Sequence, residues 1–212
     1  MSLQYSVRLY LPTEKIEQAL FATIEIASKS DQWFNIRLPN NRKILVPGDK
    51  WNRERLHLQI GEEITLNTSL LFPVDEFVQA YIVASKKIGV NLKLTIVDGK
   101  DYCPIGRISL TLTARSKFTE FDFLASVSSF NEIFLKSNSA HQQFLKVLNA
   151  VDGVAGLIFV GTRRFHLLHD PEKTIYLNED RYYLDGEYGD GVEKDIDRLT
   201  EAIKSKISDL KS

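Results

Sequence analysis

Leu9-Tyr10-Leu11-Pro12-Thr13-Glu14-Lys15-Ile16-Glu17-Gln18-Ala19-Leu20 is the stretch that decides the fold, because the chain carries a second version of it. The second version is Leu70-Leu71-Phe72-Pro73-Val74-Asp75-Glu76-Phe77-Val78-Gln79-Ala80-Tyr81. In both, apolar residues alternate up to a proline, which predicts a strand that ends there because proline cannot donate to a ladder. In the first copy Thr13, which can cap a helix, follows the proline directly. Each copy therefore predicts a strand followed by a helix.

The similarity continues beyond these stretches in the same order. Residues 35–38 (Asn-Ile-Arg-Leu) are echoed by 91–94 (Asn-Leu-Lys-Leu), and 55–60 (Arg-Leu-His-Leu-Gln-Ile) by 107–112 (Arg-Ile-Ser-Leu-Thr-Leu). The connections are shorter in the second copy, as is usual for loops on a common scaffold. We therefore expect two tandem β-α-β-β units, 5–60 and 64–115, which form a domain over residues 1–115. The alternative is chance similarity between short apolar patterns.

Both predicted helices carry an apolar stripe at spacings of three and four residues, which places each set on one helix face. We expect both stripes to lie on a sheet. The first stripe contains Ile16, Ala19, Leu20, Thr23 and Ala27, and the second contains Phe77, Ala80, Tyr81, Ala84 and Ile88.

Further strands are expected near 33–38, 44–46, 55–60, 64–72, 91–97 and 105–114. The last two alternate regularly between apolar and polar residues, for example Ile108, Leu110 and Leu112 against Ser109 and Thr111. Such alternation is typical of antiparallel strands with one buried face and one solvated face.

The remaining part, residues 116–212, is expected to be a C-terminal α+β part that packs against the first domain. A long helical region, 126–151, is interrupted by Ser137-Asn138-Ser139, whose side chains compete for backbone hydrogen bonds and so predict a kink or a split. Strands are expected near 157–160, 165–169, 174–177 and 182–184. An amphipathic helix that begins at Asp190-Gly191-Val192-Glu193, a capping-box pattern, ends the chain. The predicted fold class is α+β with a mainly antiparallel sheet.

Composition limits the classes of protein to consider. The 212 residues carry a formal net charge of −1 and are 43% hydrophobic, which is ordinary for a globular protein. The single cysteine, Cys103, excludes an intrachain disulfide and is compatible with a reducing compartment. No signal peptide and no apolar run long enough to span a membrane are evident, so we expect a cytoplasmic protein with no membrane contact.

Charge is distributed unevenly in spite of the small total. Residues 37–57 hold six Lys or Arg against two acids, with Trp51 inside this stretch and Trp33 next to it, and residues 178–197 hold eight acids against two bases. Basic residues interleaved with aromatic ones can bind single-stranded nucleic acid. The acidic stretch would weaken the attraction of phosphates, so we favour a solvated loop, or a patch that meets the acidic stretch of the same or another copy, over nucleic-acid binding.

Candidate chemical groups are few. His166 and His169 lie three residues apart on a predicted strand, which directs the two imidazoles to opposite faces, so we predict no metal site there. His141 lies on a mostly apolar helix stripe and is more typical of a core histidine than of a ligand. We predict no bound cofactor, no catalytic residue can be named, and we favour a protein without enzymatic activity.

Two functional hypotheses follow. The first is a protein-binding or scaffold module that uses the solvated sheet face, with Arg8, Tyr10, His57 and Gln59 as its contact residues, because tyrosine and arginine anchor many interfaces. Its partner would be another protein or a second copy. The alternative is a small-molecule-binding protein or enzyme with a pocket between the sheets, lined by Arg164, His166 or His141.

Overall fold

The chain forms an α+β structure in a computed structural model that describes residues 5–29, 32–48, 56–116, 118–125, 131–153, 155–160, 164–168 and 170–176. The predicted fold class is confirmed, since a mainly antiparallel large sheet and a second small sheet accompany the helices. The predicted strand near 182–184, the last helix, His169 and Trp51 lie outside the described residues.

The first half of the chain contains seven strands and two α-helices within the described residues. In chain order they are β1 (Tyr5–Pro12), a 3-10 turn η1 (Thr13–Lys15), α1 (Ile16–Glu25), β2 (Trp33–Arg37), β3 (Lys43–Pro47), β4 (Leu56–His57), β5 (Glu63–Pro73), α2 (Glu76–Lys87), β6 (Thr95–Val97) and β7 (Lys100–Ala114). The second half contains β8 (Phe118–Ala125), α3 (Asn131–Lys136), α4 (Asn138–Ala150), β9 (Ala155–Val160), β10 (Arg164–Leu167) and β11 (Asp170–Tyr176).

The large sheet has the strand order β11-β10-β9-β1-β8-β7-β5, and β6 pairs with β7 beside this path. All of its described pairs are antiparallel. The small sheet has the order β3-β2-β4, and its β2–β4 pair is parallel. Strand β1, which is close to the N-terminus, therefore lies between two strands from the second half of the chain.

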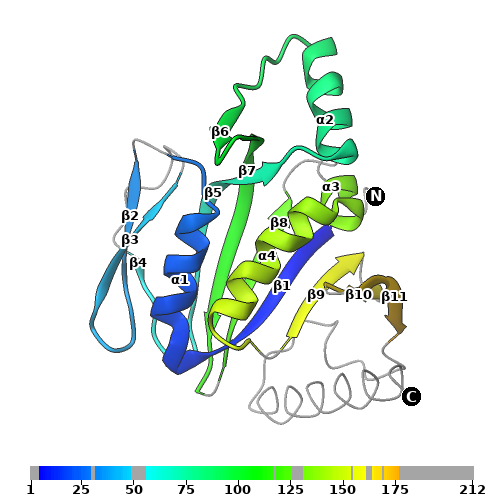
Figure 1. Ribbon diagram of the computed structural model, residues 1–212. Coiled ribbons are helices and arrows are strands. Elements are labelled where there is room, and N and C mark those ends of the chain that lie inside the picture. Colours follow the sequence, from blue (N-terminus) through cyan, green and yellow to red (C-terminus); the bar gives the residue numbers. More distant parts are fainter. Residues whose placement is uncertain are drawn as a thin grey trace.

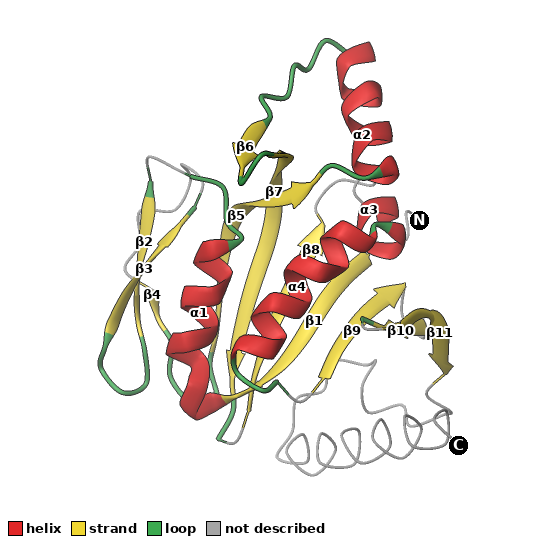
Figure 2. Cartoon of the chain, viewed as in Figure 1, coloured by secondary structure: helices red, strands yellow, loops and turns green. Residues whose placement is uncertain are grey.

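Helices α1, α3 and α4 cover one face of the large sheet, and the small sheet lies on the outer side of α1 (Figure 2). One continuous core fills this space. Phe144 on α4 is its centre, with ring centroids 5.1 Å from Phe123, 5.5 Å from Phe134 and 5.8 Å from Phe72. The residues of the first predicted stripe, on α1 and just beyond its end, are all buried, as expected.

The long helical region is split where the sequence predicts it. Helix α3 ends at Lys136 and α4 begins at Asn138, and the Ser137 hydroxyl accepts a hydrogen bond from the Ala140 amide as the N-cap of α4. Strand β8, in contrast, was not expected. Its signal is the alternation of Phe121, Phe123 and Ala125, which are buried, with Glu120 and Asp122, which are half-buried.

Both repeat segments begin with a strand and a helix, but three strands follow α1 and two follow α2, and these strands pair differently. In the first segment β1 lies in the large sheet and β2 to β4 form the small one, whereas β5, β6 and β7 of the second segment all lie in the large sheet. The duplication of one module, and the domain boundary near residue 115 that depends on it, stay predictions.

Candidate functional site

Arg8 is surrounded by acidic and aromatic side chains on the sheet face opposite the helices. The strand register places it beside Asp122 of β8, and its Nε lies 3.2 Å from Asp122 Oδ2 while its Nη1 lies 3.5 Å from Glu120 Oε1. Its guanidinium also stacks over the ring of Phe159, 4.2 Å from the centroid. The charge of Arg8 is thus already paired within the chain, which leaves it little capacity to anchor a partner.

Burial controls the ionisation of this cluster. It raises the pKa of Glu120 to about 7, with Arg8 opposing the rise and the neighbouring Asp122 adding to it. It also raises the pKa of Asp122, again against the effect of Arg8. Burial alone would lower the pKa of Arg8, but the two carboxylates outweigh burial and raise it.

The expectation of a solvated face fails at β1 and holds further along the sheet. Tyr10 is only 3% exposed and packs beside Phe118, with ring centroids 6.2 Å apart. On β5 and β7 the same face is open to solvent to a greater degree, and Thr65 and Thr111 share a 2.9 Å hydrogen bond there. The exposure of this face differs because β1 is a central strand of the sheet, whereas β5 and β7 lie toward its edge.

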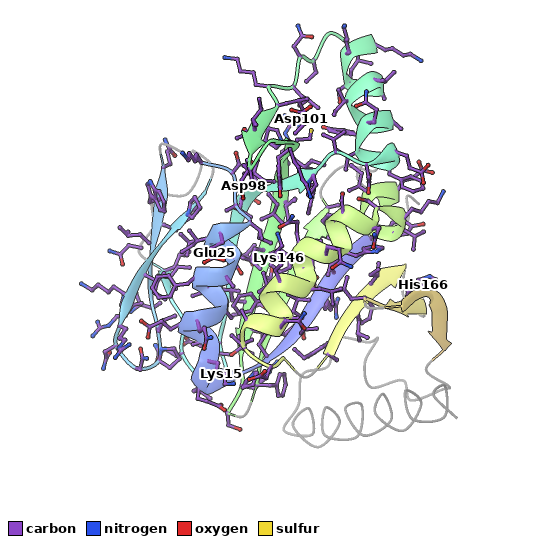
Figure 3. The ribbon with its side chains drawn as sticks, in the orientation of Figure 1. Lys15, Glu25, Asp98, Asp101, Lys146 and His166 are labelled. Atoms are coloured by element: carbon purple, nitrogen blue, oxygen red, sulfur yellow. The ribbon has the colours of Figure 1, made fainter. Side chains whose placement is uncertain are left out.

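The remaining predicted binding residues are not brought together with Arg8. His57 is exposed on β4 of the small sheet, and Gln59 is exposed just beyond that strand. Arg164 lies at the start of β10, and His166, also on β10, pairs with Ile158, which shares the helix-covered face of Val7. His166 is therefore on the face opposite Arg8, on the β9–β11 side of the molecule (Figure 3).

His141 is a core histidine, as its position on an apolar stripe suggests. It is 2% exposed, and its Nε2 lies 2.7 Å from the carbonyl oxygen of Phe134. Burial lowers its pKa, and His166 acts in the same direction. No group of three or more His, Cys, Asp or Glu side chains that could hold a metal ion occurs in the described part of the chain.

Asp75 joins α2 to the junction between α3 and α4. Its Oδ1 accepts hydrogen bonds from the amides of Phe77 and Val78, which caps α2, and its Oδ2 accepts from Ser137 Oγ at 2.6 Å and from the Ser139 amide at 3.2 Å. Burial favours a raised pKa, but these hydrogen bonds outweigh it and hold the pKa of Asp75 below its usual value. One carboxylate thus fixes where α2 leaves the rest of the molecule.

Residues 76–97, here called the arm, project beyond the end of the helix-covered sheet (Figure 1). The arm comprises α2, a connecting loop and β6. Within α2 only Val78 and Ser85 are buried. The prediction that the second apolar stripe lies on a sheet is wrong, because Ala80, Ala84 and Ile88 are exposed.

Exposed apolar side chains are concentrated on the arm. Of the ten large hydrophobic residues that are exposed among the described ones, six lie between positions 83 and 97. The most exposed are Ile88, at 79%, and Ile96, at 72%; the other four are Val83, Val90, Leu94 and Val97. Such clustering is typical of an interaction surface, whereas single exposed apolar residues are not informative.

Sequence reasoning missed this surface because it assigned Leu94 and Ile96 to the buried face of a strand over 91–97. The structure has only the short β6 there, and both side chains are exposed. A usable signal was present at the turn that follows α2. Ile88 and Val90 flank Gly89, whose φ is 80°, and turns of this kind normally carry polar residues.

Two further observations concern membranes and thiol chemistry. None of the helices in the described ranges has the length and the apolar character needed to cross a bilayer. Cys103 is a free, buried thiol, and burial raises its pKa to about 11, which disfavours the reactive thiolate.

No protein-family model matches the chain, and no curated protein and no solved structure is significantly similar to it. The candidate site is therefore judged on geometry alone. By exposure and chemistry, the arm is the strongest candidate.

Proposed function

We propose that this protein is a non-enzymatic protein-binding module and that its binding surface is the arm. The observation that carries the proposal is the concentration of six exposed large apolar side chains between residues 83 and 97. Covering apolar surface contributes roughly 25 cal/mol for each Å² removed from water, so these side chains favour association with another protein surface.

The arm supports binding better than the sheet face around Arg8. Arg8 is neutralised by Glu120 and Asp122, and Tyr10 is buried, so neither presents the free polar anchor that an interface needs. The arm, in contrast, is held at a defined position by the hydrogen bonds of Asp75 while most of its own apolar residues stay uncovered. A fixed, uncovered surface can bind without ordering a flexible segment first.

The test is a cross-linking capture that compares matched surface variants. The purified chain would be cross-linked in an extract of its source cells, and captured proteins, including further copies of the chain, would be quantified. Ile88→Asp with Ile96→Asp should abolish capture, because charges on the arm oppose its desolvation. The control Leu45→Asp changes a side chain of β3 that is 56% exposed and lies outside the arm, and it should capture what the wild type does.

Far-UV circular dichroism and thermal unfolding would verify that both variants are folded. Capture of the same proteins in the same amounts by the arm variant would contradict the proposal. Loss of capture by Leu45→Asp as well would show that the arm is not the specific surface.

The cytoplasm is the location we propose. The single cysteine supports it, because a chain with no possible internal disulfide does not depend on an oxidising compartment. Fractionation of source cells would test the location directly.

A further inference from the structure

We propose that the arm binds a second copy of this chain, with the two α2 helices packed antiparallel along Glu76, Ala80, Val83 and Lys87. This proposal rests on the proposed function and names its partner. The four residues are all exposed, and they form what is here called the α2 seam.

The α2 seam is the side of the helix that the protein itself does not cover. Successive residues of an α-helix are rotated by about 100°, so Val78 and Ser85 lie on one side of α2 and the seam lies on the opposite side. Val78 and Ser85 are the buried residues of this helix. Figure 1 shows that α2 extends past the sheet at one end of the molecule.

The spacing within the seam is that of a coiled coil. Steps of four, three and four residues separate Glu76, Ala80, Val83 and Lys87, and these are consecutive d and a positions of a heptad. Ala80 is small enough to let two helix axes approach closely, and Val83 supplies apolar contact. The two inner positions, Ala80 and Val83, are exposed and apolar and can pack against a partner helix, and the two outer positions carry opposite charges.

The seam is complementary to itself only in the antiparallel orientation. If Glu76 of one copy lies opposite Lys87 of the other, Ala80 lies opposite Val83 and Gln79 lies opposite Ala84, each pair occurring twice about the two-fold axis. The acidic first turn of α2 then faces the basic last turn of its partner, Lys86 and Lys87. Antiparallel helix dipoles add to this attraction. A parallel pair would instead place glutamate against glutamate and lysine against lysine.

The size of the contact predicts a weak, reversible dimer. A standard interface uses about 20–30 residues on each side, and a 12-residue helix offers fewer. The exposed apolar side chains of Ile88 and Val90, which follow α2 directly, extend the contact at both ends of the seam. We expect association in the micromolar range.

Sedimentation velocity of the purified full chain, at roughly 1 to 500 µM, tests the dimer through charge reversal. The wild type should shift from monomer to dimer over this range. Glu76→Lys and Lys87→Glu should each weaken association about tenfold, because each creates two like-charge contacts per dimer. The double variant Glu76→Lys/Lys87→Glu should associate again, and an equimolar mixture of the two single variants should form a heterodimer.

Lys43→Glu is the matched control, since Lys43 is an exposed lysine of β3 outside the arm and its reversal should leave association unchanged. Circular dichroism of each variant checks that helix content is retained. Monomeric wild type at the highest concentration would overturn the proposal, as would single reversals that leave the dimer unaffected, which a parallel or unrelated contact would produce. A monomeric wild type whose arm variant still loses cross-linked proteins would refute the dimer and leave the proposed function standing. If the wild type is monomeric and the arm variant still captures the same proteins as the wild type, both the dimer and the proposed function are refuted.

Discussion

Helices α2 and α4 are nearly equal in length, 12 and 13 residues, and both carry apolar stripes, but they are buried to different extents. In α4 six residues are buried, among them Phe144 at the centre of the aromatic core. In α2 two are buried. An apolar stripe in the sequence therefore does not show how much of that helix face the chain itself will cover.

The body and the arm are also stabilised by different interactions. The body of the molecule, meaning the large sheet with α1, α3 and α4, is stabilised by its own buried apolar contacts. In the arm few side chains are buried, Val78 and Ser85 within α2, and the hydrogen bonds at its base and the pairing of β6 with β7 also hold it in place. Local opening should therefore be easier in the arm than in the body.

The largest expected effect is that of truncating the central aromatic residue of the body. Phe144→Ala should lower the free energy of unfolding by about 3–5 kcal/mol, because it leaves a cavity between Phe72, Phe123 and Phe134. Urea unfolding followed by circular dichroism measures the loss. The matched truncation in the arm, Val83→Ala, should change it by no more than about 0.5 kcal/mol, because Val83 is 44% exposed. Similar losses for the two variants would break the comparison.

A smaller effect is expected at the junction of the two regions. Asp75→Ala should cost about 2 kcal/mol, because it removes the cap of α2 and leaves the buried Ser137 without one of its partners. Amide hydrogen exchange should accelerate in α2 above all. Asp75→Asn keeps an oxygen acceptor for the cap and should lose less. Unchanged exchange in α2 with Asp75→Ala would show that the arm does not depend on this carboxylate.

An effect no larger than this is expected from the buried charges of the body. The folded pKa of Glu120, about 7, lies above its ordinary value of 4.5, so the folded state binds more protons between these pH values. The free energy of unfolding should therefore fall as pH rises from about 5 to 7, by roughly 1 kcal/mol per pH unit at most. Glu120→Gln should flatten this slope in urea unfolding measured across that range. Glu62→Gln, which changes an exposed carboxylate before β5, should keep the wild-type slope; an unchanged slope in both would exclude Glu120 as its source.

Features encoded locally could be predicted from the sequence. The break between α3 and α4 was predicted because Ser137 can cap a helix through its own side chain, and the structure uses it in that way. The α1 stripe could be predicted because its residues recur at spacings of three and four over successive helical turns. His141 as a core residue followed from its apolar neighbours along the helix.

Features that depend on pairing between distant segments could not be predicted. Nothing in residues 5–12 specifies that β1 will lie between β8 and β9. The two-residue alternation of side chains along a strand is the same whichever strands lie next to it. The burial of Tyr10 and the pairing of Arg8 with Glu120 follow from that central position. Strand β8 was missed although Phe121 and Phe123 alternate with Glu120 and Asp122, and in the structure these two acids face Arg8.

Strand β7 connects the arm to the large sheet. It is 15 residues long, roughly 50 Å at strand spacing, and it pairs with β6 near the arm and with β8 in the centre of the sheet. Where β5 changes register between Thr68 and Leu70, β7 inserts an extra residue, and Arg107 there has φ of 59°. The pairing of β6 with β7 thus connects the arm to the same strand that pairs with β8 in the centre of the sheet, so displacing β6 would load the hydrogen bonds of that sheet directly.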